Sequence, residues 1–327
     1  MLIEQLAPGA LDVVGDVHGE IEPLRVLLER LGYSEHGKHP HGRRLVFVGD
    51  LVDRGPDSAG VVKLVSRMID AGNAQCVLGN HELNILRESR KHDNAWFFED
   101  TDSATQDEIM RFICERPLAL ERPGLRVVHA CWHPTSIDAA LVHGGGVLDC
   151  FRQAEQAVVD ALDAEGLSIE AARQKSLASV RDEAKKPEMQ RALGESDVRK
   201  QMGNPVKVLT SGIERVADEP FWANGKWRFA QRVPWWNDYD EDSMVIVGHY
   251  WRSRHPGHSF VDEPGLFGNA APTDLVGPAE RVMCIDYSIG RRPMERAKVG
   301  RQGPFRSALA AYRLRDGEPG DVVFSPA

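Results

Sequence analysis

The stretch VVGDVHGE (residues 13–20) decides the fold, because a short apolar run ends there in a loop of glycine, aspartate and histidine. The same arrangement returns in LVFVGDLVDRG (residues 45–55) and in QCVLGNHE (residues 75–82). Each apolar run has the length and composition of a buried strand. The sequence therefore places ionisable side chains directly after three successive strands.

Helical patterns lie between these strands. Apolar residues recur at helical spacing from Ile21 to Leu31, before Gly32, and from Val61 to Ile69, before Gly72. Alternating strands and helices are typical of an α/β protein whose parallel or mixed sheet is covered by helices. Further strands are expected at Leu125–Val128, Met244–Val247 and Arg281–Ile285.

The region 151–200 has a different composition. It contains no strand-like run, is rich in Ala, Glu, Lys and Arg, and has apolar residues at helical intervals. We expect a helical insertion within a single domain that spans residues 1–327. Its charges nearly cancel, which favours solvent-exposed helix faces, and a protein partner that binds 151–200 is the alternative.

Composition excludes several classes of protein. Apolar residues make up 42% and charged residues 27% of the 327 residues, which are values of a globular chain and not of a disordered or fibrous one. The formal net charge of −9 argues against bulk binding of nucleic acid or of an anionic membrane. Five scattered cysteines are typical of reduced thiols, and neither a signal peptide nor a run of about 18 apolar residues is evident, so we expect a cytoplasmic protein without membrane spans.

The ionisable residues after the strands indicate a metal site. Loops at the carboxyl ends of strands in an open α/β sheet converge on one crevice, so residues far apart in sequence meet there. Carboxylate oxygens beside imidazole nitrogens, without paired thiolates, suit Mn²⁺, Fe or Zn²⁺ better than an iron–sulfur or structural zinc centre. Two such ions about 4 Å apart can hold a phosphoryl group for in-line displacement. The residues expected to meet are Asp16, His18, Asp50, Asp53, Asn80, His81, His129 and His249.

The motifs resemble the signatures of the phosphoprotein phosphatase family of the calcineurin-like metallophosphoesterases. GDVHG, GDLVDRG and GNHE match specifically, whereas HACWHP and VGHYW match less closely, because Cys131 stands where the family often has a glycine. Pro134 stands five residues after His129, as in the family, which favours His129 over His133 as the ligand. The resemblance spans roughly Leu11–Trp251 and implies a two-sheet sandwich flanked by helices, with the dinuclear site at one sheet edge.

The resemblance also implies two divalent metal ions, with Mn²⁺ expected first and Fe or Zn as alternatives. Asp50 would bridge both ions, because a carboxylate has two oxygens to share. The nucleophile would be a water or hydroxide between the ions, and no covalent phosphoenzyme is expected. The implied ligands are Asp16 and His18 for the first ion, Asp50 for both, and Asn80, His129 and His249 for the second.

Substrate-binding and acid–base residues follow from the same resemblance. Asp53 would orient His81, which would donate a proton to the leaving oxygen. Arg54 would bind phosphate oxygens through its planar donors, together with Asn80. The family supplies a second phosphate-binding arginine from a later loop, and the sequence leaves three candidates for it, namely Arg215, Arg232 and Arg252.

Four neighbouring aromatic residues have two alternative interpretations. In the first interpretation they line a substrate pocket. In the second they belong to the hydrophobic core, where such aromatic residues are found more often. The residues are Trp235, Trp236, Tyr250 and Trp251.

Three functions compete on this basis. The first is a serine/threonine phosphoprotein phosphatase, which GNHE and the Asp53–Arg54 signature favour, and its substrate is a phosphorylated protein or a small phosphoester. The second is a nucleotide phosphohydrolase of the dinucleoside tetraphosphatase type, because VVGDVHG and RRLVFVGDLVDRGPDS read much like the bacterial members. The third is a non-catalytic scaffold. A scaffold derived from an inactive enzyme would be expected to lack the acid or a metal ligand, and none of these residues is missing here.

Overall fold

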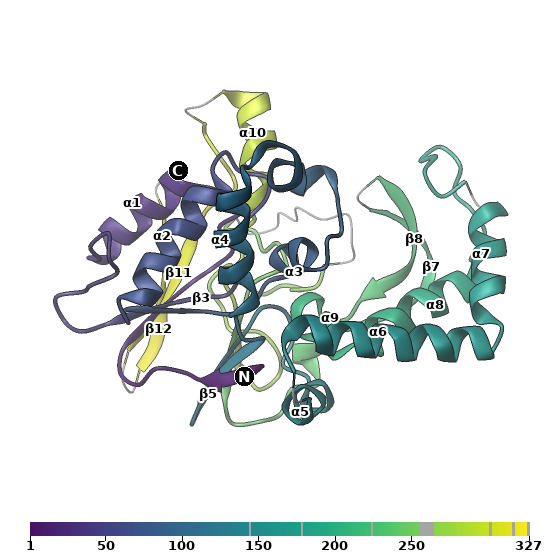
Figure 1. Cartoon of the computed structure of the whole chain (residues 1–327), viewed down its shortest axis with the longest axis horizontal. Coiled ribbons are helices and arrows are strands. Elements are labelled where there is room, and N and C mark those ends of the chain that lie inside the picture. Colours follow the sequence, from purple (N-terminus) through teal and green to yellow (C-terminus); the bar gives the residue numbers. More distant parts are fainter. Residues whose placement is uncertain are drawn as a thin grey trace.

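Two mixed β-sheets form the centre of the molecule in the computed structural model. The structure describes residues 1–143, 145–177, 179–223, 225–255, 265–300, 303–315 and 318–325. Figure 1 shows the sheets with helices beside them and a lobe that projects away from this body. Within the described ranges each of the two sheets has five strands, and a separate two-stranded hairpin lies in the lobe.

The first sheet contains the strands that the opening motifs predict. Strands β2 (Leu11–Val14), β3 (Arg44–Phe47) and β4 (Ala74–Cys76) run parallel, so their carboxyl ends lie at one edge. Strand β11 (Ala310–Arg315) pairs antiparallel with β2, and β12 (Glu318–Phe324) pairs antiparallel with β11. The three motif strands are thus confirmed, and the chain's last two strands complete their sheet.

The second sheet supplies the other two motif strands. Its order is β1 (Ile3–Gln5), β5 (Ala119–Arg122), β6 (Leu125–Val128), β9 (Met244–Val247) and β10 (Val282–Cys284). Only the β5–β6 pair among them is antiparallel. The carboxyl ends of β6 and β9 therefore point the same way, which places the loops after them together.

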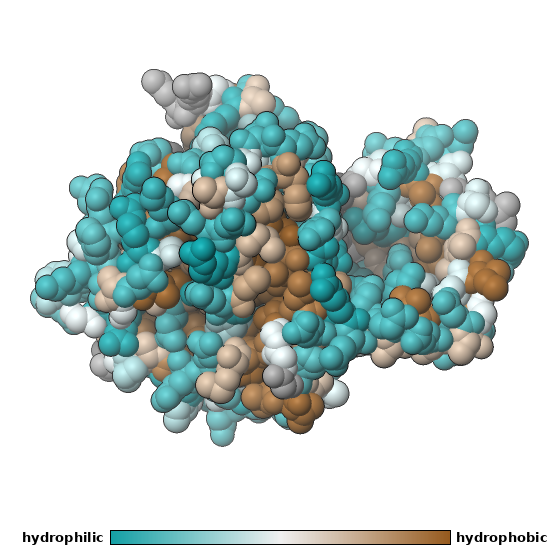
Figure 2. Space-filling model, in the orientation of Figure 1, coloured by the Kyte–Doolittle hydropathy of each residue, from teal (hydrophilic) through white to brown (hydrophobic). Residues whose placement is uncertain are grey.

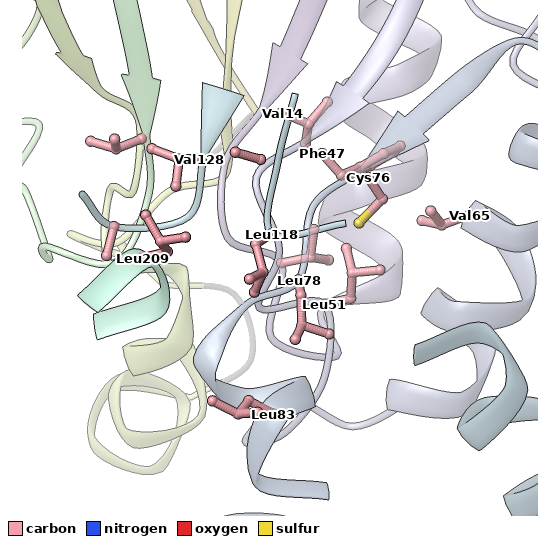
Figure 3. Packing of buried hydrophobic residues seen from close by; sticks show 14 of the residues in the cluster. Val14, Phe47, Leu51, Val65, Cys76, Leu78, Leu83, Leu118, Val128 and Leu209 are labelled. Atoms are coloured by element: carbon pink, nitrogen blue, oxygen red, sulfur yellow. The ribbon is translucent and has the colours of Figure 1, made fainter. Parts of the chain in front are cut away.

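The core forms because side chains alternate across each strand. Leu11 and Val13 of β2 belong to the apolar layer between the sheets, together with Val127 of β6. Val14 of β2 and Phe47 of β3 face the opposite way, into a cluster shared with the helices. Figure 3 shows this second cluster. Successive side chains of each strand point to opposite faces of the sheet, and both faces are buried. The strands therefore appear in the sequence as continuous apolar runs.

Helices cover the outer faces of the sandwich. Helices α1 (Ile21–Leu31) and α2 (Ser58–Asp70) pack their apolar faces into the same cluster as β2 and β3. Gly32 ends α1 in the left-handed conformation, which is the stop that the sequence predicts. Other α-helices of the body, within the described residues, are α3 (Asn80–Leu86), α4 (Ser103–Cys114), α5 (Pro134–Val142), α9 (Pro205–Ser211) and α10 (Arg292–Val299).

The projecting lobe contains both helices and strands. Helices α6 (Val147–Ala164), α7 (Leu167–Leu177) and α8 (Arg191–Met202) account for most of the region expected to be helical, but residues 179–190 within it form turns and irregular chain, and Ala178 lies outside the described residues. The hairpin of β7 (Glu214–Ala223) and β8 (Lys226–Arg232) packs against α8 and extends the lobe beyond residue 200. That the lobe is an insertion in one domain stays a prediction.

The surface of the molecule is mostly hydrophilic in the view of Figure 2, which also shows a hollow between the body and the lobe. Among the apolar side chains that are exposed are Leu141 and Val142, at the end of α5. No helix in the described part of the chain is long and apolar enough to cross a membrane.

Candidate metal and catalytic centre

The loops at the carboxyl ends of five strands bring the predicted residues together. Each loop follows a strand of one of the two sheets, so the residues gather where the sandwich opens. Each metal-ligand candidate except Asn80 is buried, Asn80 being half-buried. The residues come from the loops after β2 (Asp16, His18), β3 (Asp50, Asp53, Arg54), β6 (His129) and β9 (His249), and from the first turn of α3, which follows β4 (Asn80, His81).

Asp50 lies at the centre and turns one oxygen toward each half of the site. Its Oδ2 is 3.7 Å from Nε2 of His18, and its Oδ1 is 3.4 Å from Nε2 of His129. Two triads of potential ligands share Asp50: one adds His18 and His81, the other His129 and His249. The ligand atoms within each triad lie within 4.8 Å of one another. A single carboxylate thus serves two adjacent groups.

Asn80 and Asp16 complete the two groups. The amide oxygen of Asn80 lies 3.1 Å from Nε2 of His129 and 2.8 Å from Nδ1 of His249, so it belongs to the second group. Asp16 Oδ2 lies 3.9 Å from Nε2 of His18, and both Asp16 oxygens accept the backbone N–H of His249. Distance alone therefore groups His81 with His18 and Asp50, whereas the family resemblance implies Asp16 in that place.

The histidines are oriented to present lone pairs to the centre. Nδ1 of His18 lies 3.1 Å from the carbonyl oxygen of Val52, and Nδ1 of His129 lies 2.7 Å from that of Val48. An N–H donated to each carbonyl leaves Nε2 of both rings as an acceptor facing Asp50. Nε2 of His249 is buried without a hydrogen-bond partner. A set of oxygen and nitrogen acceptors turned toward one another fits divalent cations.

The electrostatics of the cluster also favour bound cations. Burial raises the pKa of Asp16, and the negative charge of Asp286 beside it raises this pKa further. Burial opposes protonation of His129, yet the neighbouring Asp50 carboxylate raises the pKa of His129 to about 10, so without a cation the pair holds a proton. Burial, and then the positive charge of Arg232, keep the pKa of His249 well below its usual range. A divalent cation would compensate the buried carboxylates and displace that proton.

Glu82, the last residue of GNHE, clamps two motif loops together. Its buried carboxylate accepts the backbone N–H groups of Asp50 and Gly79 on Oε2, and those of Leu51 and Val52 on Oε1. The four distances lie between 2.7 and 3.2 Å. The motifs suggested no role for this residue, although an acidic residue in the first turn of a buried helix signals such a contact.

His81 and Asp53 form the expected pair. Nδ1 of His81 lies 2.6 Å from Oδ2 of Asp53, and both residues are buried. Nε2 of His81 lies 3.1 Å from Nη2 of Arg54 and 4.0 Å from Oδ2 of Asp50. Oδ1 of Asp53 accepts a 2.8 Å hydrogen bond from Nε1 of Trp96, a residue that no motif indicated. His81 thus presents one ring nitrogen toward the site, and Asp53 holds the other.

The site contains several residues with left-handed backbone. A positive φ is uncommon for residues other than glycine and is kept only where the surrounding structure enforces it. At Trp251 the buried Asp286 carboxylate does so, because it accepts the backbone N–H of Trp251 at 2.9 Å. Residues with positive φ are His18 (49°), Asp50 (48°), Asp53 (74°), Arg54 (70°), His249 (70°) and Trp251 (45°).

A pocket of about 760 Å³ opens over the cluster. Asp50, Asn80 and His249 line its inner part, and Arg54 and Lys91 contribute positive charge to its wall. This volume is within the range of pockets that take small molecules. The pocket is therefore the place where a substrate would meet the cluster.

The structure distinguishes the three candidate arginines. Arg232, at the end of β8, lines the pocket. Arg252 is buried and donates to the backbone carbonyls of Ala271, Asp274 and Cys284, which is a structural role. Arg215 pairs with the exposed Asp218. Arg232 alone among the three faces the site.

The structure also divides the four aromatic residues between the core and the pocket. Trp235, Trp236 and Tyr250 are buried, as the core interpretation expects. Trp251 lines the pocket, where the guanidinium carbon of Arg54 lies 4.9 Å from its ring centre. Only the last of the four fits the pocket interpretation.

Known proteins share sequence with the part of the chain that carries the motifs. A family model described as calcineurin-like phosphoesterase matches residues 10–176, just over half of the chain. The asymmetrical bis(5'-nucleosyl)-tetraphosphatase PrpE of Halalkalibacterium halodurans is 51% identical over 79 residues, which cover 23% of this chain and 32% of that protein. A symmetrical bis(5'-nucleosyl)-tetraphosphatase of Ralstonia nicotianae is 34% identical over 134 residues, which cover 40% of this chain and 44% of that protein.

Two facts limit the conclusions that these similarities allow. The matches span 32% and 44% of the length of these two curated relatives, which is less than half of each. A solved structure of a protein serine/threonine phosphatase from Saccharomyces cerevisiae covers 97% of this chain and 80% of its own, but with 13% identity and a TM-score of 0.48 it supports no function. The family match over residues 10–176 includes the motif loops that end β2, β3, β4 and β6. The chain belongs to the calcineurin-like phosphoesterase family.

Proposed function

We propose that this chain is a metal-dependent phosphohydrolase that cleaves dinucleoside polyphosphates. The observation that carries the proposal is Asp50, whose two oxygens face two separate groups of histidine and amide ligands beneath a pocket with cationic walls. Such a pair of groups, joined by one carboxylate, is the arrangement that a two-metal phosphoryl transfer needs.

The residues would divide between two divalent ions. When bound, the ions would neutralise charge on the phosphate and supply an activated water near neutral pH. His18 and Asp16 would hold the first ion and His129, His249 and Asn80 the second, with Asp50 shared. Mn²⁺ is the first choice because the donor set mixes hard oxygens with imidazoles, and Fe and Zn²⁺ fit the same set.

The chain's own residues would position the substrate and manage the proton. Arg54 lies in the pocket with its Nη1 and Nη2 each 3.1 Å from an Nε2, of His18 and of His81, so its guanidinium reaches the edge of the cluster, where it would bind phosphate oxygens. Asp53 keeps the proton of His81 on Nδ1 while the ring is neutral. Protonated at Nε2, His81 would donate a proton to the leaving oxygen, which is general acid catalysis.

The substrate class rests on the pocket and on the relatives. Arg54, Lys91 and Arg232 line one pocket, and three cations suit a chain of several phosphates better than a single phosphate. Two relatives are named bis(5'-nucleosyl)-tetraphosphatases. These findings favour the nucleotide function over the phosphoprotein function that the motifs alone placed first.

A substrate panel tests the proposal. Diadenosine tetraphosphate, a phosphoserine peptide and p-nitrophenyl phosphate would be compared with Mn²⁺, and nucleotide products would be separated by chromatography. We expect the dinucleotide to have the highest kcat/KM; two ADP would indicate symmetrical cleavage, and AMP with ATP asymmetrical cleavage. Efficient cleavage of the peptide with an inert dinucleotide would overturn the proposal.

A pair of variants tests the role of the pocket's arginine. Arg232→Met should raise KM for diadenosine tetraphosphate by about 10-fold or more, because one charged hydrogen bond contributes roughly 1.5–3 kcal/mol. Arg215→Met is the matched control, because Arg215 lies on the same hairpin and pairs with Asp218 instead. Equal KM values in the two variants would contradict a phosphate-binding role for Arg232.

A further inference from the structure

Trp96 lies at a point where the pocket wall meets the His81–Asp53 pair. Its indole N–H donates a 2.8 Å hydrogen bond to Oδ1 of Asp53, while Oδ2 of the same carboxylate lies 2.6 Å from Nδ1 of His81. The three side chains form a continuous row, from Trp96 through Asp53 to His81. Asp53 is 1% exposed, so water cannot readily replace the indole as a partner for Oδ1.

Contacts of the segment around Trp96 hold the indole in place. Trp96 begins a π-helical turn, Trp96–Asp100, a rare conformation that is frequent at functional sites. Thr101 Oγ1 donates to the carbonyl oxygen of Trp96 at 2.8 Å, and Nε2 of Gln106 in α4 donates to that of Phe97 at 2.6 Å. The ring of buried Phe97 packs edge-on against the indole, with centroids 5.7 Å apart. The indole N–H is thereby held in place independently of Asp53.

The consequence for Asp53 is a fixed rotamer. A carboxylate with one partner on each oxygen cannot rotate without breaking a bond, and a lost partner would leave a buried oxygen unsatisfied. Asp53 itself has left-handed backbone, with φ of 74°, and its N–H donates to Ser58 Oγ at 2.9 Å. The contact of its backbone with Ser58 does not fix the plane of the Asp53 carboxylate. The orientation of that plane therefore depends on the two side-chain partners, Trp96 on Oδ1 and His81 on Oδ2.

We propose that Trp96 is a positioning residue for the acid pair: its N–H holds the Asp53 carboxylate, which accepts the Nδ1 proton of His81 and so keeps Nε2, the nitrogen that donates a proton from the charged ring, turned toward the leaving group. This inference rests on the proposed function, since it assigns His81 as the proton donor. It adds a residue that lies outside the sequence motifs. Trp96 lines the pocket wall, but its N–H is engaged by Asp53, so it acts on the reaction through Asp53.

The test uses Trp96→Phe, which removes the N–H and keeps an aromatic ring, with Trp222→Phe as the matched control. Trp222 lies on β7 in the lobe, so the same substitution is made away from the site. Both variants would be assayed with Mn²⁺ on aryl phosphates of increasing leaving-group pKa, from p-nitrophenyl phosphate to phenyl phosphate. Substrates with poor leaving groups depend most on the proton donor.

Trp96→Phe should lower kcat for phenyl phosphate by about 10- to 100-fold, the size of one hydrogen bond to a charged group, and lower kcat for p-nitrophenyl phosphate much less. KM should change by no more than about threefold, because the indole N–H is engaged by Asp53 and is not free to donate to the phosphate. An equal loss for every leaving group, or a loss confined to KM, would overturn the proposal.

A second measurement needs neither metal nor substrate. The ¹⁵N shifts of the His81 ring in the metal-free protein report which nitrogen carries the proton. At a pH where the ring is neutral, we expect the Nδ1–H form in the wild type and in Trp222→Phe, and a mixture of both forms in Trp96→Phe. An unchanged His81 ring in Trp96→Phe would overturn the proposal. Inactivity of the wild type toward diadenosine tetraphosphate would overturn only the substrate assignment, because both readouts are independent of it.

Discussion

Replacing Glu82 by glutamine should destabilise the protein far more than an ordinary surface substitution. The carboxylate accepts four backbone N–H groups, two on each oxygen, from Asp50, Leu51, Val52 and Gly79. A glutamine amide offers only one oxygen, so two buried N–H donors would face an NH₂ group. An unsatisfied buried donor costs roughly 1–3 kcal/mol, so we expect the free energy of unfolding to fall by about 3–4 kcal/mol.

The assay is urea unfolding of the metal-free protein, followed by calorimetric titration with Mn²⁺. Glu29→Gln on α1 is the matched control, because Glu29 is exposed and its substitution should change the unfolding free energy by no more than about 0.5 kcal/mol. Glu82→Gln should also weaken binding of both ions, because the loop that carries Asp50 loses its anchor. A destabilisation below about 1 kcal/mol together with unchanged Mn²⁺ binding would refute the clamp.

Three further predictions concern single side chains. Asp50→Asn should abolish binding of both ions, because its two oxygens serve separate groups, and metal analysis that finds one tightly bound ion per chain would contradict this. His81→Ala should lower kcat by about 10²–10⁴ with metal content retained, whereas loss of metal would make His81 a ligand, as the distances allow. Asp12 is buried, which raises its pKa, but donors from Arg43, Arg313 and Tyr33 more than offset this and lower its pKa below the ordinary 3.8. Its contribution to stability is therefore present above about pH 4 and lost as the pH falls through the lower folded-state value, so Asp12→Asn should flatten the acid side of a Tm–pH profile.

The motif loops could be predicted because their signals are local. An apolar run followed at once by aspartate, histidine or asparagine identifies both a buried strand and the residues at its end, and Leu11–Val14 and Leu125–Val128 are strands with the expected bounds. The convergence of Asp50, His129 and His249 then follows from the parallel arrangement of the strands.

Contacts without a local signal could not be predicted. Trp96 meets Asp53 across 43 residues of chain, through a π-helical turn that no residue pattern indicates. Strand β11 carries Arg313 and Arg315 and does not read as a central strand, although it pairs with β2. The Arg313 side chain is accommodated because its donors reach the buried carboxylate of Asp12 on β2. Such pairing is set by the tertiary structure and not by the propensity of the segment.

The choice among the arginines also required coordinates. Arg215 and Arg232 lie on opposite strands of one hairpin and are alike in sequence context. Only the position of the hairpin against the body brings Arg232 to the pocket. For the same reason the motifs did not separate phosphoprotein from nucleotide substrates, since they describe the phosphate site and not the walls around it.

The left-handed residues of the site have a consequence for protein engineering. Six side chains that face the cluster or the pocket stand on backbone that glycine would adopt more easily, at a cost of order 1–3 kcal/mol for each strained residue. A screen for heat resistance alone would therefore reward glycine or asparagine at these positions, and each gain would remove a side chain that the site uses. Engineering for thermostability should therefore leave these six residues unchanged and vary the solvent-facing positions of the lobe instead.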